Sequence, residues 1–570
     1  MTTKKHCEHT PLLISSSSMY NKKDEEAWIS ASTSSSHIPS SSCTFNLLIS
    51  IFIPSLSGFV FGYDQTVIES ILSLPNFQHH YFDKNKVTFI NPFNYLTIGF
   101  YLMAILGTMY GSYICDFAGR KKALIGSYIL LCLGTLFYTC FIHSIVFLLG
   151  RMIIGFAFGL ILVVSPIIIA ELAPSDIRGC LVGFLTLFIM AGNLSGYYMM
   201  NAMKPTMSAS IISSNNKNHH PYHFHFFSGD FVWQYDWRSP LLLESFFLFL
   251  LILAQYHLPE SPRWLALAFQ QESKKQDNSQ HNNNNYLDTI YFQGLQTIAF
   301  LQEKDQNHVL VRQTWKQLCH ADCLIEEDGE DHHQKNNQSL LNHIKKTFLF
   351  FLKQKKTILL GCIFIVANYM TGFEVIVKYY ASDIIYAAGL PTTSPFSAPG
   401  CIKSILMAST AISLGWFVDN IDRKIMLMMG SMMVAMCQFS IGIIFYHFTS
   451  IDLQTGTLTI VSPHARTLVS ASVYILMASY AFTWGSLIMV TILEWFSTVN
   501  RARGVAIIMV IYWSGQWLML VSSPWHFFIS ASLIYFIYGI STLFTCYFVY
   551  RWVPNTTKIS LDHITDNLIP

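Results

Sequence analysis

The stretch GRMIIGFAFGLILVVSPIIIAELAPSDIRG, residues 150–179, decides the fold. Residues 152–170 carry no charged side chain, whereas Arg151 precedes them and Glu171 and Arg178 follow. A bilayer core of about 30 Å is crossed by about 20 apolar residues in a helix, because a helix satisfies its own backbone polar groups. The stretch therefore predicts a transmembrane helix near 145–170 with charged groups at its ends.

The composition extends this interpretation to the whole chain. Hydrophobic residues make up 52% of the sequence, aromatic residues 15% and charged residues only 12%, against about 25% charged residues in soluble domains. Such a chain needs the lipid bilayer as its solvent. The formal net charge of +2 excludes a nucleic-acid binder with a broad basic face. Most of the cysteines lie inside apolar runs, where they are expected to be buried hydrophobic residues and not disulfides.

Eleven further windows have the length and hydropathy of a span. The sequence predicts an all-α membrane protein with six spans, a polar loop and six more spans. The candidates lie near 46–70, 95–115, 123–143, 145–170, 180–201 and 239–257, and near 357–388, 399–418, 425–447, 467–493, 504–522 and 526–550. The first of them begins after about 45 polar residues, too late for a cleaved signal peptide.

These spans predict five regions. They are a disordered tail (1–45), a six-helix bundle (46–257), a central loop (258–356), a second six-helix bundle (357–551) and a short tail (552–570). Lys and Arg concentrate in alternate loops, after the second, fourth, eighth and tenth spans and in the central loop. Because basic loops stay on the cytoplasmic side, both termini and the central loop are expected to face the cytoplasm.

The two halves repeat one charge pattern. DFAGRKK follows the second span and DNIDRK follows the eighth, and a glutamate precedes an arginine by seven residues after both the fourth and the tenth spans. An acid at one helix end paired with an arginine of the next span would form a latch that closes the inner side. Membrane topology alone would explain the basic residues but not the matching acids. The predicted gating residues are Asp116, Arg120, Glu171, Arg178, Asp419, Arg423, Glu494 and Arg501.

At this point the chain resembles the sugar porter family of the major facilitator superfamily, over about residues 50–565. The resemblance rests on GYDQTVI (62–68), DFAGRKK (116–122), GR and PIIIAELAPSDIRG (150–179), WRSP (237–240) and PESPRWL (259–265). It implies twelve transmembrane helices in two pseudo-symmetric six-helix bundles, with transport by alternating access. The Asn- and Ser-rich insertions are similar to yeast members, which implies the plasma membrane, with the vacuolar membrane as the alternative.

The resemblance also implies a site for proton coupling. Charges inside spans are costly and therefore point to function. Asp64 in the first span matches the aspartate that proton-coupled members use, and Arg151 matches the arginine near it. A deprotonated Asp64 would pair with Arg151, and protonation would release the arginine. Facilitative members share this aspartate, so facilitated diffusion remains the alternative.

The substrate site departs from the family pattern. Family members hold sugar hydroxyls with amides, which both donate and accept hydrogen bonds. Here the matching positions hold Thr186, Met407 and Met489, and Glu244 replaces another glutamine. We expect Glu374 and Lys378, four residues apart, to neutralise one another. The predicted substrate-binding residues are Thr186, Asn368, Tyr369, Glu374, Tyr379, Trp513 and Gln516.

Together these patterns predict a transporter of a sugar or sugar-like polyol, with protons as the open second partner. The alternatives are a non-transporting sugar sensor of the same fold, and a porter for another small solute such as inositol or quinate. No phosphate-binding loop, nucleophile–base pair or usual zinc spacing is present in the sequence. We therefore expect no enzyme activity, no cofactor and no metal.

Overall fold

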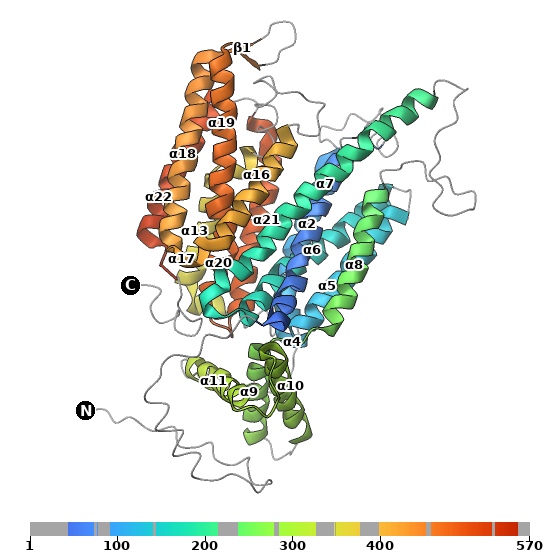
Figure 1. The fold of residues 1–570 in the computed structure, drawn as a ribbon, viewed down its shortest axis with the longest axis vertical. Helices are drawn as coiled ribbons and strands as arrows, with labels where there is room; N and C mark the ends of the chain where they lie inside the picture. The colour runs from blue at the N-terminus through green and yellow to red at the C-terminus, as the bar shows by residue number, and fades with distance from the viewer. Residues whose placement is uncertain are drawn as a thin grey trace. The chain divides into compact units, whose positions relative to one another are not determined.

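The computed structural model shows a set of long helices within residues 44–556. The described residues are 44–72, 74, 77, 92–140, 144–214, 238–278, 284–326, 347, 349–376, 398–451, 458–526 and 531–556. The first half contributes α2 (Phe45–Leu72), α4 (Pro92–Ala118), α5 (Arg120–Cys140), α6 (Ser144–Leu172), the 3-10 turn η1 (Ser175–Ile177), α7 (Arg178–Ser214) and α8 (Ser239–His257). Figure 1 shows these helices in blue to green.

The second half repeats the arrangement with more breaks in its helices. It contributes α13 (Lys355–Met370), α14 (Phe373–Val375), α16 (Ala398–Ile412), α17 (Val418–Asn420), α18 (Arg423–Phe448), α19 (Pro463–Tyr480), α20 (Ser486–Glu494), α21 (Arg501–His526) and α22 (Ala531–Trp552). Two π-helical turns, η3 (Ser413–Phe417) and η4 (Ala481–Gly485), continue α16 and α19. The strands β1 (Thr449–Ile451) and β2 (Leu458–Ile460) form an antiparallel hairpin in which Ser450 faces Thr459.

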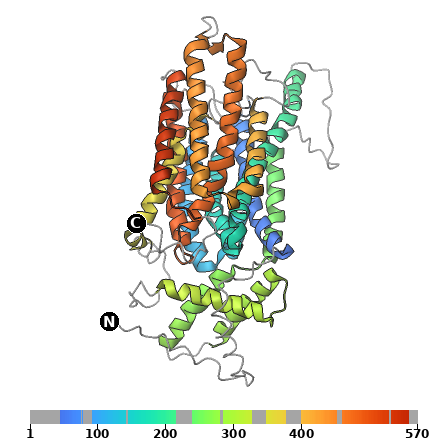
Figure 2. The same cartoon turned by 60° about the vertical axis from the view of Figure 1, so that its left-hand side comes forward.

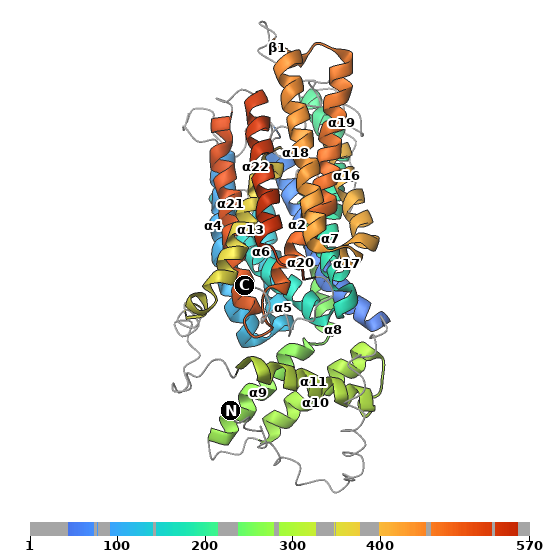
Figure 3. The same ribbon diagram turned by 90° about the vertical axis from the view of Figure 1, so that its left-hand side faces the viewer.

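Eleven helical segments among the described residues are long and apolar enough to cross a membrane. The remaining predicted span, 357–388, corresponds to α13 and α14, and residues 377–397 lie outside the described part. Within the halves, α2 packs on α7, α4 on α6, and α18 on α22; between them, α21 packs on α4 and α16 on α7 (Figures 1 and 3). The predicted all-α fold of twelve transmembrane helices in two bundles is confirmed.

Close helix approach in the first half depends on glycine. A Cβ on Gly62 of α2 would lie 2.0 Å from the Ile189 carbonyl oxygen of α7, and one on Gly192 would lie 2.1 Å from the Phe59 carbonyl oxygen. Only glycine at both positions lets the two backbones touch. The contact sets Thr66 of the GYDQT segment against Asn193 of α7.

A break between α13 and α14 is fixed by buried polar side chains. Gly372 has φ of +68°, in the left-handed region. The carbonyl oxygen of Thr371 accepts a hydrogen bond from Gln438 Nε2 (2.6 Å), and Gln438 Oε1 accepts one from Thr542 Oγ1 (3.0 Å). A broken helix is tolerated in a membrane only where its freed backbone groups find partners. The break between α13 and α14 is therefore stabilised by specific hydrogen bonds within the second half.

We expect Gly372→Ala to destabilise the protein by about 1–3 kcal/mol, the usual cost of forcing a side chain into the left-handed region. The new Cβ would also lie 2.4 Å from the Tyr538 ring. The measurement is thermal unfolding in detergent. Gly126→Ala is the matched control, because Gly126 lies in α5 with no atom within 4 Å of the added Cβ. Equal unfolding temperatures for the two variants would contradict the role given to Gly372.

Three helices pack at one end of the bundle. They are α9 (Pro262–Asn278), α10 (Asn284–Gln302) and α11 (Val309–Glu326), and their small core includes Leu265, Ile298 and Trp315 (Figures 1 and 2). Trp264 Nε1 donates to the Asp116 carbonyl oxygen (3.3 Å), and Asn46 Nδ2 donates to that of Phe300 (3.0 Å). We call this end of the bundle the loop end.

Candidate functional site

A buried ion pair joins two helices of the first half. Arg151 Nη1 of α6 lies 2.6 Å from Asp64 Oδ2 of α2, and both side chains are almost fully buried. Gln65 Nε2 also donates to Asp64 Oδ2 (3.3 Å), and the Phe100 ring stacks under the Arg151 guanidinium, 4.2 Å from its Cζ. The structure therefore brings the two predicted proton-coupling residues into direct contact.

A second buried carboxylate lies beside this pair. The Tyr138 hydroxyl of α5 is 3.4 Å from Asp64 Oδ1 and 3.3 Å from Glu244 Oε2 of α8. Glu244 is 1% exposed, and its Oε1 has no hydrogen-bond partner among the described residues. The sequence showed Glu244 only as a departure from glutamine. The signal for its importance was an acid within a span, but no pattern in the sequence links Tyr138 to both acids.

The predicted substrate residues of α13 face other helices of the second half. The Asn368 side-chain oxygen accepts from the Tyr480 hydroxyl (2.7 Å), and the Tyr369 hydroxyl donates to the Tyr512 carbonyl oxygen (2.6 Å). Both residues are buried. Tyr480 stacks on Phe373, with 3.5 Å between the ring centroids. Asn368 and Tyr369 are thus held by aromatic neighbours on the α19 and α21 sides.

Trp513 of α21 lies where the two halves meet. Its ring is 1% exposed and contacts Phe61, Phe100 and Tyr101 of the first half, with ring centroids 5.9–6.0 Å apart. Phe100 is the same ring that stacks on Arg151. A predicted substrate residue and the predicted proton site therefore share one aromatic neighbour.

The other predicted substrate residues are more scattered. Thr186 is buried in α7, Glu374 is half-buried in α14, and Gln516 is buried in α21 with its Nε2 3.5 Å from the Tyr512 hydroxyl. Tyr379 and Lys378 lie outside the described residues. The substrate role of Tyr379 and the Glu374–Lys378 pair therefore stay predictions.

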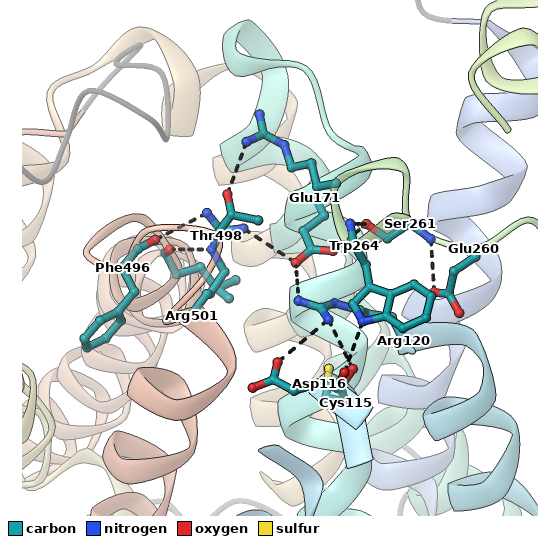
Figure 4. A network of polar contacts seen from close by, with 12 residues as sticks. Cys115, Asp116, Arg120, Glu171, Glu260, Ser261, Trp264, Phe496, Thr498 and Arg501 are labelled. Atoms are coloured by element: carbon teal, nitrogen blue, oxygen red, sulfur yellow. Dashed lines mark hydrogen bonds and ion pairs between the residues drawn. The ribbon is translucent and has the colours of Figure 1, made fainter. Parts of the chain in front are cut away.

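Three of the predicted gating residues of the first half, Asp116, Arg120 and Glu171, meet at the loop end (Figure 4). Arg120 Nη2 lies 3.1 Å from Glu171 Oε1 and its Nη1 lies 3.8 Å from Asp116 Oδ1. The second half reaches the same acids, with Arg501 Nη1 3.8 Å from Glu171 Oε1 and Arg503 Nη2 3.6 Å from Asp116 Oδ2. The contacts of Arg501 and Arg503 therefore link the two halves at this end.

The second half mirrors this arrangement. Arg423 Nη2 lies 2.8 Å from Glu494 Oε1 and 3.9 Å from Asp419 Oδ1. From the first half, Arg178 Nη1 lies 3.8 Å from Glu494 Oε1. Asp419 accepts the backbone N–H groups of Gly179 (2.8 Å) and Cys180 (2.9 Å), which places its charge at the positive N-terminus of α7. The eight predicted gating residues thus form two equivalent ion-pair clusters of four, which together we call the latch network.

The network contains residues that the repeat did not predict. Ser261 Oγ donates to Glu171 Oε2, and Thr556 Oγ1 donates to Glu494 Oε2 (2.6 Å). Ser261 belongs to PESPR and Thr556 to PNTTK, one after each half, so comparing these strings would have found them. Glu260 accepts the backbone N–H groups of Lys121 and Ser261, which lower its pKa, but burial raises that pKa more.

Among the described residues, no group of three or more His, Cys, Asp or Glu side chains lies close enough together to hold a metal ion. The described polar side chains of the interior form ion pairs and hydrogen bonds with one another. This is the chemistry of pairing and release, which suits conformational change.

Comparison with known proteins identifies the family. The family described as "Sugar (and other) transporter" matches residues 50–568. A D-xylose-proton symporter-like protein of Arabidopsis thaliana is 23% identical over 95% of this chain and 85% of its own, and a myo-inositol transporter of Candida albicans is 22% identical over 92% and 83%.

Solved structures of similar fold include the proton:xylose symporter XylE bound to 6-bromo-6-deoxy-D-glucose. The match to that structure has a TM-score of 0.68 at 21% identity and covers 93% of this chain and 100% of the XylE chain. The inward-open conformation of XylE from Escherichia coli gives a TM-score of 0.57 at 21% identity, over 90% and 98% of the two chains. These relatives are transporters and not enzymes. Because the family match spans nearly the whole chain, the protein belongs to the family of sugar (and other) transporters.

Proposed function

We propose that this protein carries a sugar or sugar-like polyol across the membrane by alternating access and couples that movement to protons at Asp64. The observation that carries the proposal is the buried Asp64–Arg151 pair, 2.6 Å apart within the membrane-spanning part of the bundle. Relatives named as transporters of xylose, glucose and myo-inositol support both a sugar and a cyclic polyol as substrate.

The hydrogen bonds around the pair support proton binding. Tyr138 has one hydroxyl proton and lies within hydrogen-bond distance of both Asp64 and Glu244. If the Tyr138 hydroxyl donates a hydrogen bond to one of the two carboxylates, the second carboxyl group can bond to the hydroxyl oxygen only if it is itself protonated and acts as the donor. Both contacts of the Tyr138 hydroxyl are therefore hydrogen bonds when either Asp64 or Glu244 is protonated. A second proton would neutralise Asp64 and weaken its hold on Arg151.

The aromatic neighbours supply a route from the substrate to this cluster. Phe100 contacts both Trp513, which we assign to the substrate site, and Arg151. A solute that displaces Trp513 would move Phe100 and so change the packing on the Arg151 guanidinium. We assign six further residues to the substrate site: Thr186, Asn368, Tyr369, Glu374, Gln516 and Tyr379.

The latch at the loop end supports alternating access. Its cross-half contacts, such as Arg178–Glu494 and Arg501–Glu171, hold only while the two halves meet at that end. We assign the loop end to the cytoplasm on the distribution of Lys and Arg, with both termini on the same side. The structure then corresponds to the state closed toward the cytoplasm. The plasma membrane is the proposed location.

The proposal predicts accumulation driven by a proton gradient. The purified protein would be placed in liposomes, and uptake of radiolabelled xylose, glucose and myo-inositol would be measured with an inward proton gradient. At least one of these solutes should accumulate above equilibrium, and a protonophore should remove the excess. Uptake that the protonophore does not change would contradict proton coupling. Binding without uptake would contradict transport and indicate a sensor.

A further inference from the structure

A lysine of the second half lies in the interface between the halves. Lys403 belongs to α16, inside the apolar segment Pro399–Asn420, and its side chain is half-buried. Its Nζ donates to Thr66 Oγ1 of α2 at 3.0 Å. Among the described residues no carboxylate lies within ion-pair distance of it, although the exposed Glu69 acts on it electrostatically. A charge at such a position is costly and calls for a functional explanation.

Lys403 is the end of a short polar chain across the interface. Thr66 Oγ1 donates its proton to Asn193 Oδ1 of α7 (3.0 Å), so the same hydroxyl accepts from Lys403. An ammonium group has three donors, and this contact uses one of them. The amide N–H groups of Asn193 make no hydrogen bond to any described residue. Lys403 and Asn193 thus bring several donors to one place, and no described group besides Thr66 accepts a hydrogen bond from these side chains.

This donor set lies along the proposed substrate site. On α7, Asn193 follows Thr186 by seven residues, two helical turns, and so lies on the same helix face. On α16, Met407 follows Lys403 by four residues, again on one face. A solute between α7 and α16 that reaches Thr186 would have Lys403, Thr66 and Asn193 beside its other end.

Among the described residues at the interface between the halves, Lys403 is a cation with no carboxylate within ion-pair distance. On the proposed function Asp64 and Glu244 share one proton through Tyr138, so that these two acids together with Arg151 carry no net charge. Lys403 is then a single cation facing the interface. One ammonium charge balances one carboxylate charge, whereas a phosphate dianion would leave a second negative charge without a counter-charge at a buried position. Carboxylate oxygens would accept from Lys403 and from the Asn193 amide.

We propose that Lys403, Thr66 and Asn193 form a carboxylate subsite, and that the solute is a polyhydroxylated monocarboxylate such as a sugar acid. This inference rests on the proposed function and narrows its substrate class. The subsite draws on both halves, because Thr66 and Asn193 belong to the first and Lys403 to the second. An acidic solute would therefore bind most tightly while the halves meet at this point.

The test compares acidic and neutral solutes on the full-length protein in lipid nanodiscs. The probes are D-glucuronate, D-galacturonate, D-gluconate and quinate, against glucose, xylose and myo-inositol, with binding measured by calorimetry and proton-driven uptake in liposomes. We expect at least one acid to bind and to be transported. Lys403→Met should weaken its binding at least tenfold and change the binding of neutral solutes less than twofold, whereas Lys403→Arg should retain most of the binding.

Control variants separate the subsite from a structural role. Lys304→Met removes an exposed lysine of the loop end and should change nothing. Neutral solutes bound and acids not bound by the wild type would overturn the carboxylate subsite and leave the proposed transport function standing. No binding of either class would overturn both. Equal losses for acidic and neutral solutes in Lys403→Met would assign Lys403 to the joint between the halves and overturn its role in substrate choice.

Discussion

Asp64→Asn is expected to abolish accumulation of substrate against its gradient while exchange of substrate across the membrane continues. An asparagine keeps the shape of the side chain but cannot bind or release a proton between pH 4 and 9. Arg151 loses the charge that lies 2.6 Å from it, as it would in the protonated wild type. The variant is therefore fixed in the protonated form, which can carry solute but no longer couples it to protons.

Two measurements test this expectation on the same liposomes: uptake driven by a proton gradient, and exchange of labelled for unlabelled solute. Asp288→Asn is the matched control, because Asp288 is an exposed aspartate of α10 and does not belong to the cluster of Asp64, Tyr138 and Glu244. It should accumulate substrate like the wild type. An Asp64→Asn protein that still concentrates its substrate would remove Asp64 as the coupling site. If Glu244→Gln then abolished accumulation, the proton site would move to Glu244.

The sequence was sufficient for the spans because each is a separate local signal. Residues 152–170 must be helical and apolar whatever surrounds them, since the bilayer imposes both conditions. The repeat of charged motifs was also informative, because a duplicated acid and a duplicated arginine need partners in equivalent places. The contacts Arg120–Glu171 and Arg423–Glu494 are equivalent in this sense.

The interior of the site could be predicted only in part. Asp64 and Arg151 were found through the family motif, but Tyr138 is an ordinary tyrosine of an apolar span until α5, α2 and α8 are packed together. Lys403 and Asn193 are likewise linked only through the Thr66 hydroxyl, which contacts both side chains in the folded protein. Such contacts depend on the rotation of each helix about its axis. Hydropathy sets the length of a span but leaves that rotation to packing.

Neutralising the latch is expected to slow turnover about tenfold or more while binding to the outward-facing state changes little. The variant is the pair of substitutions Glu171→Gln and Glu494→Gln. Each glutamate is buried and lies close to one arginine of its own half and one of the other half. Removing the two acids takes a counter-charge away from four buried arginines, which is most unfavourable while the halves meet. The balance therefore shifts toward the state that is open at the loop end.

The conformational balance can be measured apart from transport. A cysteine at Ser497, which is buried beside the latch, would report opening of the loop end through its reaction with a membrane-impermeant maleimide in inside-out vesicles. Its labelling should rise in the double variant and stay low in Glu303→Gln, which alters an exposed acid at the same end outside the network. A shift of about 1.4 kcal/mol corresponds to a tenfold change in the ratio of the two states. Unchanged labelling together with weakened binding from the outside would assign Glu171 and Glu494 to the substrate site and not to a latch.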